Sequence, residues 1–409
     1  MTSHKRPAAR DQKANPHFSY YLYSNSTPVD SSHPVWRQPL PLSRHFSGKK
    51  DEVSISYADY FGAVRTFFEN RGLEIISRAA TQTLQQTVTP EDIYEIRIRL
   101  EKHGEFYHPA RIEVPAGQQS IYFVLNVAVS ETGIRTIIEE YRNLKRLNDG
   151  FPLSFLPKVY GYGEVATAGN RKLSMFLAQW FEGYNEFHLS KDLSDNSEKI
   201  SVWDEAGSRF FLATEQQAEV YRQAAKILAY YYNVETFEQI FAWHHAAGDF
   251  VLRLENNAVD LKLITVRRYA PLLKNSGQLE TNQKDAELIL QALLLFFLSL
   301  SIRMRLDRLD GVGDITWADS RAVPAILEGF LEGLALKPQI PEMPDAIDQC
   351  FRYYLSVCSR EDLFELTAAV ANEFDPRSAE TPIVRQHLKE HVDSLYRSIE
   401  LFLHTQYMS

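Results

Sequence analysis

The strongest constraint on this chain is a paired apolar pattern inside residues 241–271, FAWHHAAGDFVLRLENNAVDLKLITVRRYAP. Alternating bulky residues fill 250–254 and 259–266, and the polar turn Glu-Asn-Asn at 255–257 separates them. Alternation on both sides of an Asn-Asn turn is typical of a β-hairpin. Asp249 stands immediately before the first run. The stretch therefore predicts a loop that presents one carboxylate at the start of a hairpin.

Residues 93–180 have the period of strands. Ile96, Ile98 and Leu100 alternate with charged residues, which is typical of a half-buried strand. Helical spacing occurs twice in the surrounding sequence, over 57–70 and over 134–148. The strands predicted from the remaining apolar runs are 73–79, 93–102, 110–114, 121–129, 158–165 and 173–180.

From residue 214 onward, apolar residues recur every three or four positions, as on one face of a helix. The apolar run at 292–302 is too short to span a bilayer, so it predicts a buried core helix and no membrane span. The predicted helices are 215–233, 285–303, 321–336, 345–357, 360–374 and 383–403.

A chain of 409 residues exceeds the usual size of one hydrophobic core, so two lobes are expected. Residues 1–52 hold six of the 18 prolines and no apolar periodicity. They predict an extended or flexible N-terminal arm, part of whose aromatic cluster packs onto the body. The predicted domains are this arm, an N-lobe over 53–183 and a helical C-lobe over 184–409.

The charge is unevenly distributed. Residues 1–50 carry eight Lys/Arg and two Asp, a net charge of +6. Because the whole chain has a net charge of −9, the remaining residues carry −15. An acidic body argues against nucleic-acid binding. Only two cysteines occur, and residues 1–16 lack the apolar core of a signal peptide. Both features are typical of a cytoplasmic protein.

A helix, a loop ending in His-x-x-x-Asp (His245 to Asp249) and a hairpin together resemble the catalytic loop of the aminoglycoside phosphotransferase and protein-kinase-like superfamily. The segment MFLAQWFEGY at 175–184 resembles the hinge of that superfamily. The resemblance covers about residues 90–335. It implies an α+β, two-lobed kinase-like fold, with a small antiparallel β-sheet N-lobe and a mostly helical C-lobe.

The resemblance also implies site residues. Asp249 takes the place of the catalytic base, and Glu140 that of the helix carboxylate that partners the phosphate-anchoring lysine. Asn126 stands near the expected position of that lysine. Gln179 and Phe181 belong to the hinge, where such proteins meet the adenine of ATP.

Several positions depart from the family pattern. Asn126 cannot neutralise phosphate as an ammonium does, and the loop HGEFYHPA at 103–110 holds one glycine. Leu254 and Thr265 stand where the metal-holding Asn and Asp are expected. Without two aligned oxygen ligands, Mg²⁺ has little reason to stay, so no metal site is predicted. Asp260 and the turn asparagines are the alternative ligands.

Other polar groups have simpler interpretations. His103, His108, His244 and His245 match no metal-ligand spacing and are expected to be loop or core residues. The charged run 303–314 predicts a salt-bridged helix end. For Asp249 itself two roles remain open: a catalytic base, or a structural carboxylate that ties down a turn.

Three functions follow. The first is a pseudokinase-like protein that binds a small molecule or a protein partner in the interlobe cleft. The second is an active ATP-dependent small-molecule phosphotransferase, with Mg-ATP as cofactor, relocated metal ligands and Asp249 as base. The third is a structural interaction protein whose cleft is filled by the aromatic arm. The oligomeric state is left open.

Overall fold

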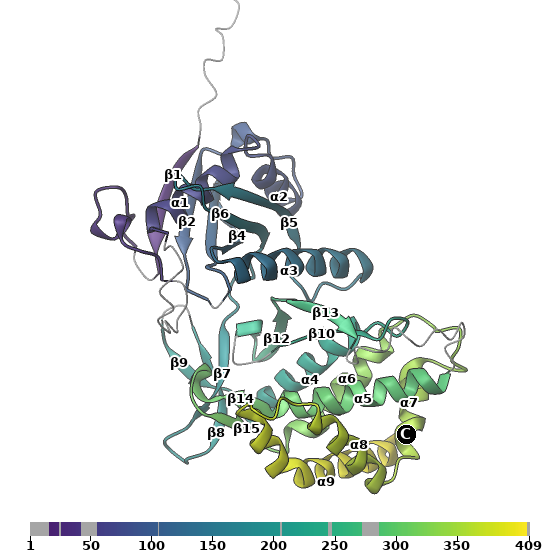
Figure 1. The fold of residues 1–409 in the computed structure, drawn as a ribbon. Helices are drawn as coiled ribbons and strands as arrows, with labels where there is room; N and C mark the ends of the chain where they lie inside the picture. Colours follow the sequence, from purple (N-terminus) through teal and green to yellow (C-terminus); the bar gives the residue numbers. More distant parts are fainter. Residues whose placement is uncertain are drawn as a thin grey trace, which may run out of the picture. The chain divides into compact units, whose positions relative to one another are not determined.

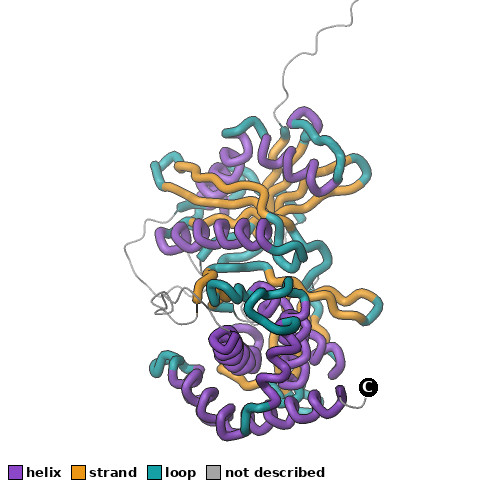
Figure 2. Tube along the Cα trace, turned by 90° about the vertical axis from the view of Figure 1, so that its right-hand side faces the viewer, coloured by secondary structure: helices purple, strands orange, loops and turns teal. Residues whose placement is uncertain are grey.

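The computed structural model describes residues 16–23, 26–41, 55–104, 106–204, 207–243, 248–271 and 286–406. The chain divides into two compact units. Unit 1 comprises Met1–Lys145 and Pro157–Glu182, and unit 2 comprises Arg146–Leu156 and Gly183–Ser409. Helices and strands occur in both, so the fold class is α+β (Figures 1 and 2).

Unit 1 contains a six-stranded sheet with the order β1-β2-β3-β4-β6-β5. Neighbouring strands are antiparallel except β1, which runs parallel to β2. The predicted all-antiparallel sheet is therefore wrong in this respect, because a segment of the predicted arm adds a strand beside β2. The strands are β1 (His17–Leu22), β2 (Glu95–Leu100), β3 (Ala110–Ala116), β4 (Gln119–Ala128), β5 (Val159–Ala166) and β6 (Lys172–Gln179).

Helices cover both faces of this sheet (Figure 1). The helices α1 (Tyr57–Glu69) and α2 (Glu74–Leu84) pack on the face that holds the main core of unit 1. On the opposite face, α3 (Glu131–Gly150) places Tyr141 against Tyr162 and Phe176, with ring centroids 5.5 and 5.9 Å apart. Because residues alternate across a strand, β4 contributes to both layers.

The strand predicted at 73–79 is wrong, since these residues belong to α2. Its buried residues Ile75, Ile76, Ala79 and Ala80 recur at the spacing of one helical face. The two adjacent isoleucines favour a strand locally, but the longer period decides the element.

The described part of the predicted arm packs into unit 1. Phe18, Val29 and Leu40 are buried in its core. The ring of Trp36, in a short 3₁₀ helix at Pro34–Arg37, stacks on Phe61 of α1 at 5.6 Å. Burial of these apolar groups holds the segment against the sheet.

Unit 2 begins with a three-stranded antiparallel sheet, β7 (Glu186–Lys191), β8 (Glu198–Trp203) and β9 (Arg209–Phe211). Its helices follow the predicted pattern. They are α4 (Thr214–Tyr231), α5 (Ala286–Arg305), α6 (Ala322–Ala335), α7 (Ile347–Ser356), α8 (Arg360–Asn372) and α9 (Glu380–Gln406). The glycine Gly329 lets α6 approach α4 closely, because a Cβ at this position would overlap the carbonyl oxygen of Arg222.

Three two-stranded sheets complete unit 2. The predicted hairpin is confirmed: β11 (Phe250–Glu255) pairs antiparallel with β12 (Ala258–Leu263). Its turn residues Asn256 and Asn257 both have positive φ, 50° and 67°, which a two-residue hairpin of this kind requires. The others join β10 (Glu238–Phe241) to β13 (Arg268–Pro271) and β14 (Leu306–Arg308) to β15 (Ile315–Trp317).

Within the described ranges, α5 is the one helix long and apolar enough to cross a membrane by length and composition. Of its most apolar window, 61% is buried inside the protein. Leu293, Phe297 and Ile302 are fully buried, so α5 resembles the core helix of a soluble protein.

Candidate active-site loop

The hairpin fixes the backbone of Asp249. Gly248, with φ of +68°, turns the chain into Asp249, which directly precedes β11. The N–H of Ile264 donates to the carbonyl oxygen of Asp249 at 2.8 Å and so extends the β11–β12 ladder by one rung. The predicted base and the segment that follows β12 therefore lie side by side. His244 and His245 lie outside the described residues.

The carboxylate of Asp249 is fully buried and neutralised by Arg267. Nη1 of Arg267 donates to Oδ2 at 3.0 Å, and Nη2 donates to Oδ1 at 2.5 Å. Thr265 adds a third hydrogen bond from Oγ1 to Oδ1 at 3.1 Å. A bidentate guanidinium–carboxylate pair is among the strongest polar contacts in proteins. The attraction and the hydrogen bonds within this pair offset the free-energy cost of burying the carboxylate.

This donor set does not fit Mg²⁺. The position predicted for a second metal carboxylate is Thr265, whose hydroxyl donates to Asp249. A permanent cation, Arg267, follows two residues later and binds both carboxylate oxygens. Magnesium prefers several oxygen ligands and is repelled by a neighbouring guanidinium. Among the described residues, no group of three His, Cys, Asp or Glu side chains is placed to hold a metal ion.

The alternative ligand Asp260 belongs to a different cluster. Its carboxylate accepts from Lys262 at 2.8 Å and from the hydroxyl of Tyr184, and Arg253 lies 3.8 Å away. Burial raises the pKa of Asp260, but the hydrogen bonds from Lys262 and Tyr184 outweigh it and leave the pKa lowered. The carboxylate of Asp260 therefore already interacts with Lys262 and Arg253 of the hairpin, which makes it a poor ligand for a metal ion.

Two of the predicted residues of unit 1 lie on the α3 side of the sheet. Glu140 of α3 is fully buried and accepts from the hydroxyl of Tyr107 at 2.6 Å. Asn126, half-buried in β4, lies opposite Phe176 in the strand register. Since Phe176 contacts Tyr141 of α3, Asn126 shares the face that α3 covers.

The predicted hinge residues end β6. The N–H of Gln179 donates to the carbonyl oxygen of Lys158 at 2.8 Å, and its side chain accepts from the N–H of Lys158 at 3.4 Å. Phe181 follows as a half-buried residue at the end of unit 1. These four predicted cofactor residues lie in unit 1, whereas Asp249 lies in unit 2.

His103 and His108 form a pair with an Nδ1–Nδ1 distance of 3.2 Å. The hydroxyl of Tyr57 lies 3.3 Å from Nε2 of His103. Burial, followed by the proximity of His103, lowers the pKa of His108 to about 3. His108 is therefore a neutral core histidine, as the sequence predicted.

Arg267 was not among the residues predicted from the sequence. The sequence feature that could have indicated it is the Arg-Arg pair directly after Thr265 and Val266. The family resemblance concerned only the aspartate that is missing at this place. No sequence pattern placed Arg267 beside Asp249, because residues 264–267 connect β12 to β13 and lie outside both strands.

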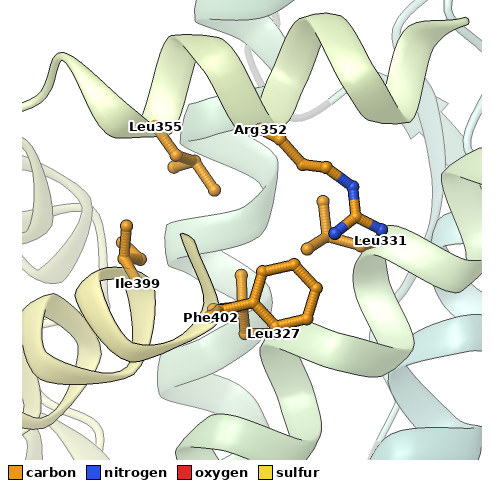
Figure 3. Close-up of a pocket in the computed structure, with 6 residues that line it drawn as sticks. All are labelled: Leu327, Leu331, Arg352, Leu355, Ile399 and Phe402. Carbon is orange, nitrogen blue, oxygen red and sulfur yellow. The ribbon is translucent and has the colours of Figure 1, made fainter. Parts of the chain in front are cut away.

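A small cavity lies among the C-terminal helices (Figure 3). It has a volume of about 10 Å³, which is room for roughly one water molecule. None of the predicted site residues lines it, and it is too small for an organic ligand. Its lining residues are Leu327, Leu331, Arg352, Leu355, Ile399 and Phe402.

No protein-family model matches this chain, and no curated protein matches it. Among solved structures it is similar to WaaP in complex with acyl carrier protein, at 12% identity and a TM-score of 0.29. That match covers 68% of this chain and 88% of the other.

Two further structures are similar at the same level. One is the complex of Neurospora crassa PAN2 with PAN3 (pseudokinase and C-term), at 12% identity and a TM-score of 0.25, over 74% of this chain and 64% of that one. The other is the MAP kinase LmaMPK10 from Leishmania major, at 10% identity and a TM-score of 0.29, over 81% and 86%. At these TM-scores the likenesses carry no conclusion about shared fold or activity.

Proposed function

We propose that this chain is a kinase-like protein, related in plan to the aminoglycoside phosphotransferases, that binds a small molecule or a protein partner without transferring phosphate. Support for the kinase-like plan comes from the order of elements. In chain order these are the antiparallel strands β2 to β4, helix α3, strands β5 and β6, helix α4 and the β11–β12 hairpin, with β7 to β9 inserted before α4 and β10 after it.

The position of Asp249 also supports that plan. It precedes the hairpin, and its Oδ1 lies 3.1 Å from Oγ1 of Thr265. Thr265 is the residue at the position where the family pattern has a metal-binding aspartate. In a phosphotransferase, the base and this metal ligand act on the same substrate and so must lie near each other. The closeness of Asp249 and Thr265 supports a loop of this kind, although Thr265 supplies a hydroxyl in place of a carboxylate.

One observation carries the proposed loss of phosphotransfer: the bidentate pair of Arg267 with a fully buried Asp249. A general base must be accessible to the proton of its substrate, and the carboxylate of Asp249 is fully buried. Here both carboxylate oxygens accept hydrogen bonds from a cation of the same chain.

Magnesium-dependent nucleotide binding gives the test. We expect no magnesium-dependent rise in melting temperature of the full chain with millimolar ATP, and no transfer of labelled phosphate. A genuine site at one hundred times its Kd would stabilise by about 2.7 kcal/mol, which thermal unfolding readily detects.

The pair of ATP titrations with and without magnesium serves as the control, because only the difference reports a metal–nucleotide site. A saturable, magnesium-dependent shift that Asp249→Asn abolishes would favour the active phosphotransferase instead.

A further inference from the structure

Arg303, in the last turn of α5, is a cation held by aromatic rings. Its guanidinium carbon lies 4.8 Å from the ring centroid of Phe241 and 4.5 Å from that of Phe374. Phe241 ends β10, and Phe374 lies just beyond α8. Three separate segments of unit 2 therefore meet around one guanidinium.

The charge of Arg303 has no counterion in the described part of the chain. No carboxylate of the described residues lies within ion-pair distance of it, and its buried Nε makes no hydrogen bond to them. Burial lowers the pKa of Arg303, and the nearby charge of Glu380 only partly opposes this. The C-terminal dipole of α5 favours a cation but offers Nε no acceptor.

Arg305, two residues further along α5, differs from Arg303 in having polar partners. It is fully buried, and its Nη1 pairs with Glu390 at 3.0 Å. Its Nε donates to the carbonyl oxygen of Ala318 at 2.9 Å. The predicted salt-bridged helix end is therefore formed by Arg305, whereas Arg303 makes no ion pair with the described residues. Leaving a half-buried cation unpaired is costly, so an anion that pairs with it would be favourable.

We propose that Arg303 is an anion-binding position that takes a carboxylate or phosphate group. A guanidinium offers N–H donors in its own plane, and this planar fork matches the paired oxygens of carboxylate and phosphate. The rings of Phe241 and Phe374 hold it by cation–π contact and leave the donors to serve an in-plane partner. The inference is independent of phosphotransfer, since it uses neither Asp249 nor a metal.

The test is thermal unfolding and calorimetric titration of the full chain with inorganic phosphate and with acetate. Potassium chloride at equal ionic strength is the reference. The variants are Arg303→Met, Arg303→Lys and the control Arg321→Met, which removes a 70% exposed arginine paired with Asp319. We expect a saturable rise in melting temperature for the wild type and for Arg321→Met. Arg303→Met should lose it, and Arg303→Lys should bind at least about tenfold more weakly.

In chloride alone, Arg303→Met should melt at or above the wild-type temperature, because an apolar side chain removes a charge that makes no ion pair with the described residues. If that variant folds poorly, Phe374→Leu keeps the arginine, removes one ring and should weaken anion binding. Equal phosphate responses in the wild type and Arg303→Met would overturn the proposal. So would a response that follows ionic strength alone in every variant. Binding here needs no magnesium, which separates it from the nucleotide test above.

Discussion

Arg267 donates two hydrogen bonds, of 3.0 and 2.5 Å, to the fully buried carboxylate of Asp249. The two residues are linked by the β11–β12 hairpin, so the pair closes the loop that the hairpin begins. A carboxylate and a guanidinium in this arrangement satisfy each other, and neither needs a metal or a substrate. The pair therefore ties the segment after β12 to the start of β11.

Breaking this pair should destabilise the protein. Removing one partner leaves a buried charge unmet, so Asp249→Asn and Arg267→Met should each lower the free energy of unfolding by about 2–4 kcal/mol. The double variant should lose clearly less than the sum. Urea unfolding of all four proteins gives the coupling energy, expected at about 1–3 kcal/mol. Additive effects would show that the two side chains do not act as a pair.

The turn of the same hairpin gives a second prediction. Asn257 has φ of 67°, which β-branched residues adopt only with strain. Asn257→Val should therefore lower stability by about 1–2 kcal/mol, whereas Asn257→Gly should be neutral or slightly stabilising. Urea midpoints of the two variants provide the comparison. A tolerated valine would mean that the turn is not held in this conformation in solution.

A third prediction concerns the packing of α4 against α6. Gly329→Ala would place a methyl group on the carbonyl oxygen of Arg222, so the helices must separate. We expect a loss of about 1–3 kcal/mol. Gly62→Ala is the matched control, because Gly62 lies inside α1 with nothing within 4 Å of an added Cβ. There the better helix propensity of alanine should stabilise by about 0.5–1 kcal/mol. Equal effects at both sites would contradict close packing at Gly329.

The fully buried His391 predicts a dependence of stability on pH. Arg305 can only donate, so Nδ1 of His391 accepts from it at 3.3 Å, and Nε2 carries the proton toward Ser301 at 3.0 Å. Burial first, and the charge of Arg305 second, lower the pKa of His391 to about 3. Below about pH 6.5 the unfolded chain takes up a proton that the folded chain refuses. Stability is therefore lost as pH falls from about 6.5 toward 3.

The measurement is the free energy of unfolding of the wild type and His391→Gln across this pH range. As the pH falls, the free energy of unfolding of the wild type should decrease more steeply than that of the variant, by up to about 1.4 kcal/mol per pH unit. The reason is that the variant lacks one titrating group. His108→Gln in unit 1 should reduce the slope in the same direction, since burial also lowers the pKa of His108 to about 3. Parallel curves for the wild type and His391→Gln would contradict a neutral buried imidazole.

The sequence by itself determined the local elements of this protein. Alternation around Asn256 and Asn257 specified the β11–β12 hairpin, and three-to-four spacing specified the helices of unit 2, because these patterns act over a few neighbouring residues. The errors of the sequence-based prediction, the strand at 73–79 and the all-antiparallel sheet, arose where a short run of β-branched residues or a distant pairing partner was decisive.

Only the tertiary structure decided which charges meet. Asp249 and Arg267 are 18 positions apart, and their pairing depends on the hairpin bringing two segments together. Arg303 and Arg305 lie in one turn of α5 and look alike in sequence, yet only Arg305 meets the carboxylate of Glu390. A salt bridge depends on the positions of two side chains to within about an ångström, and no local pattern encodes that distance. The elements follow from short-range periodicity, whereas the chemistry of the site follows from long-range packing.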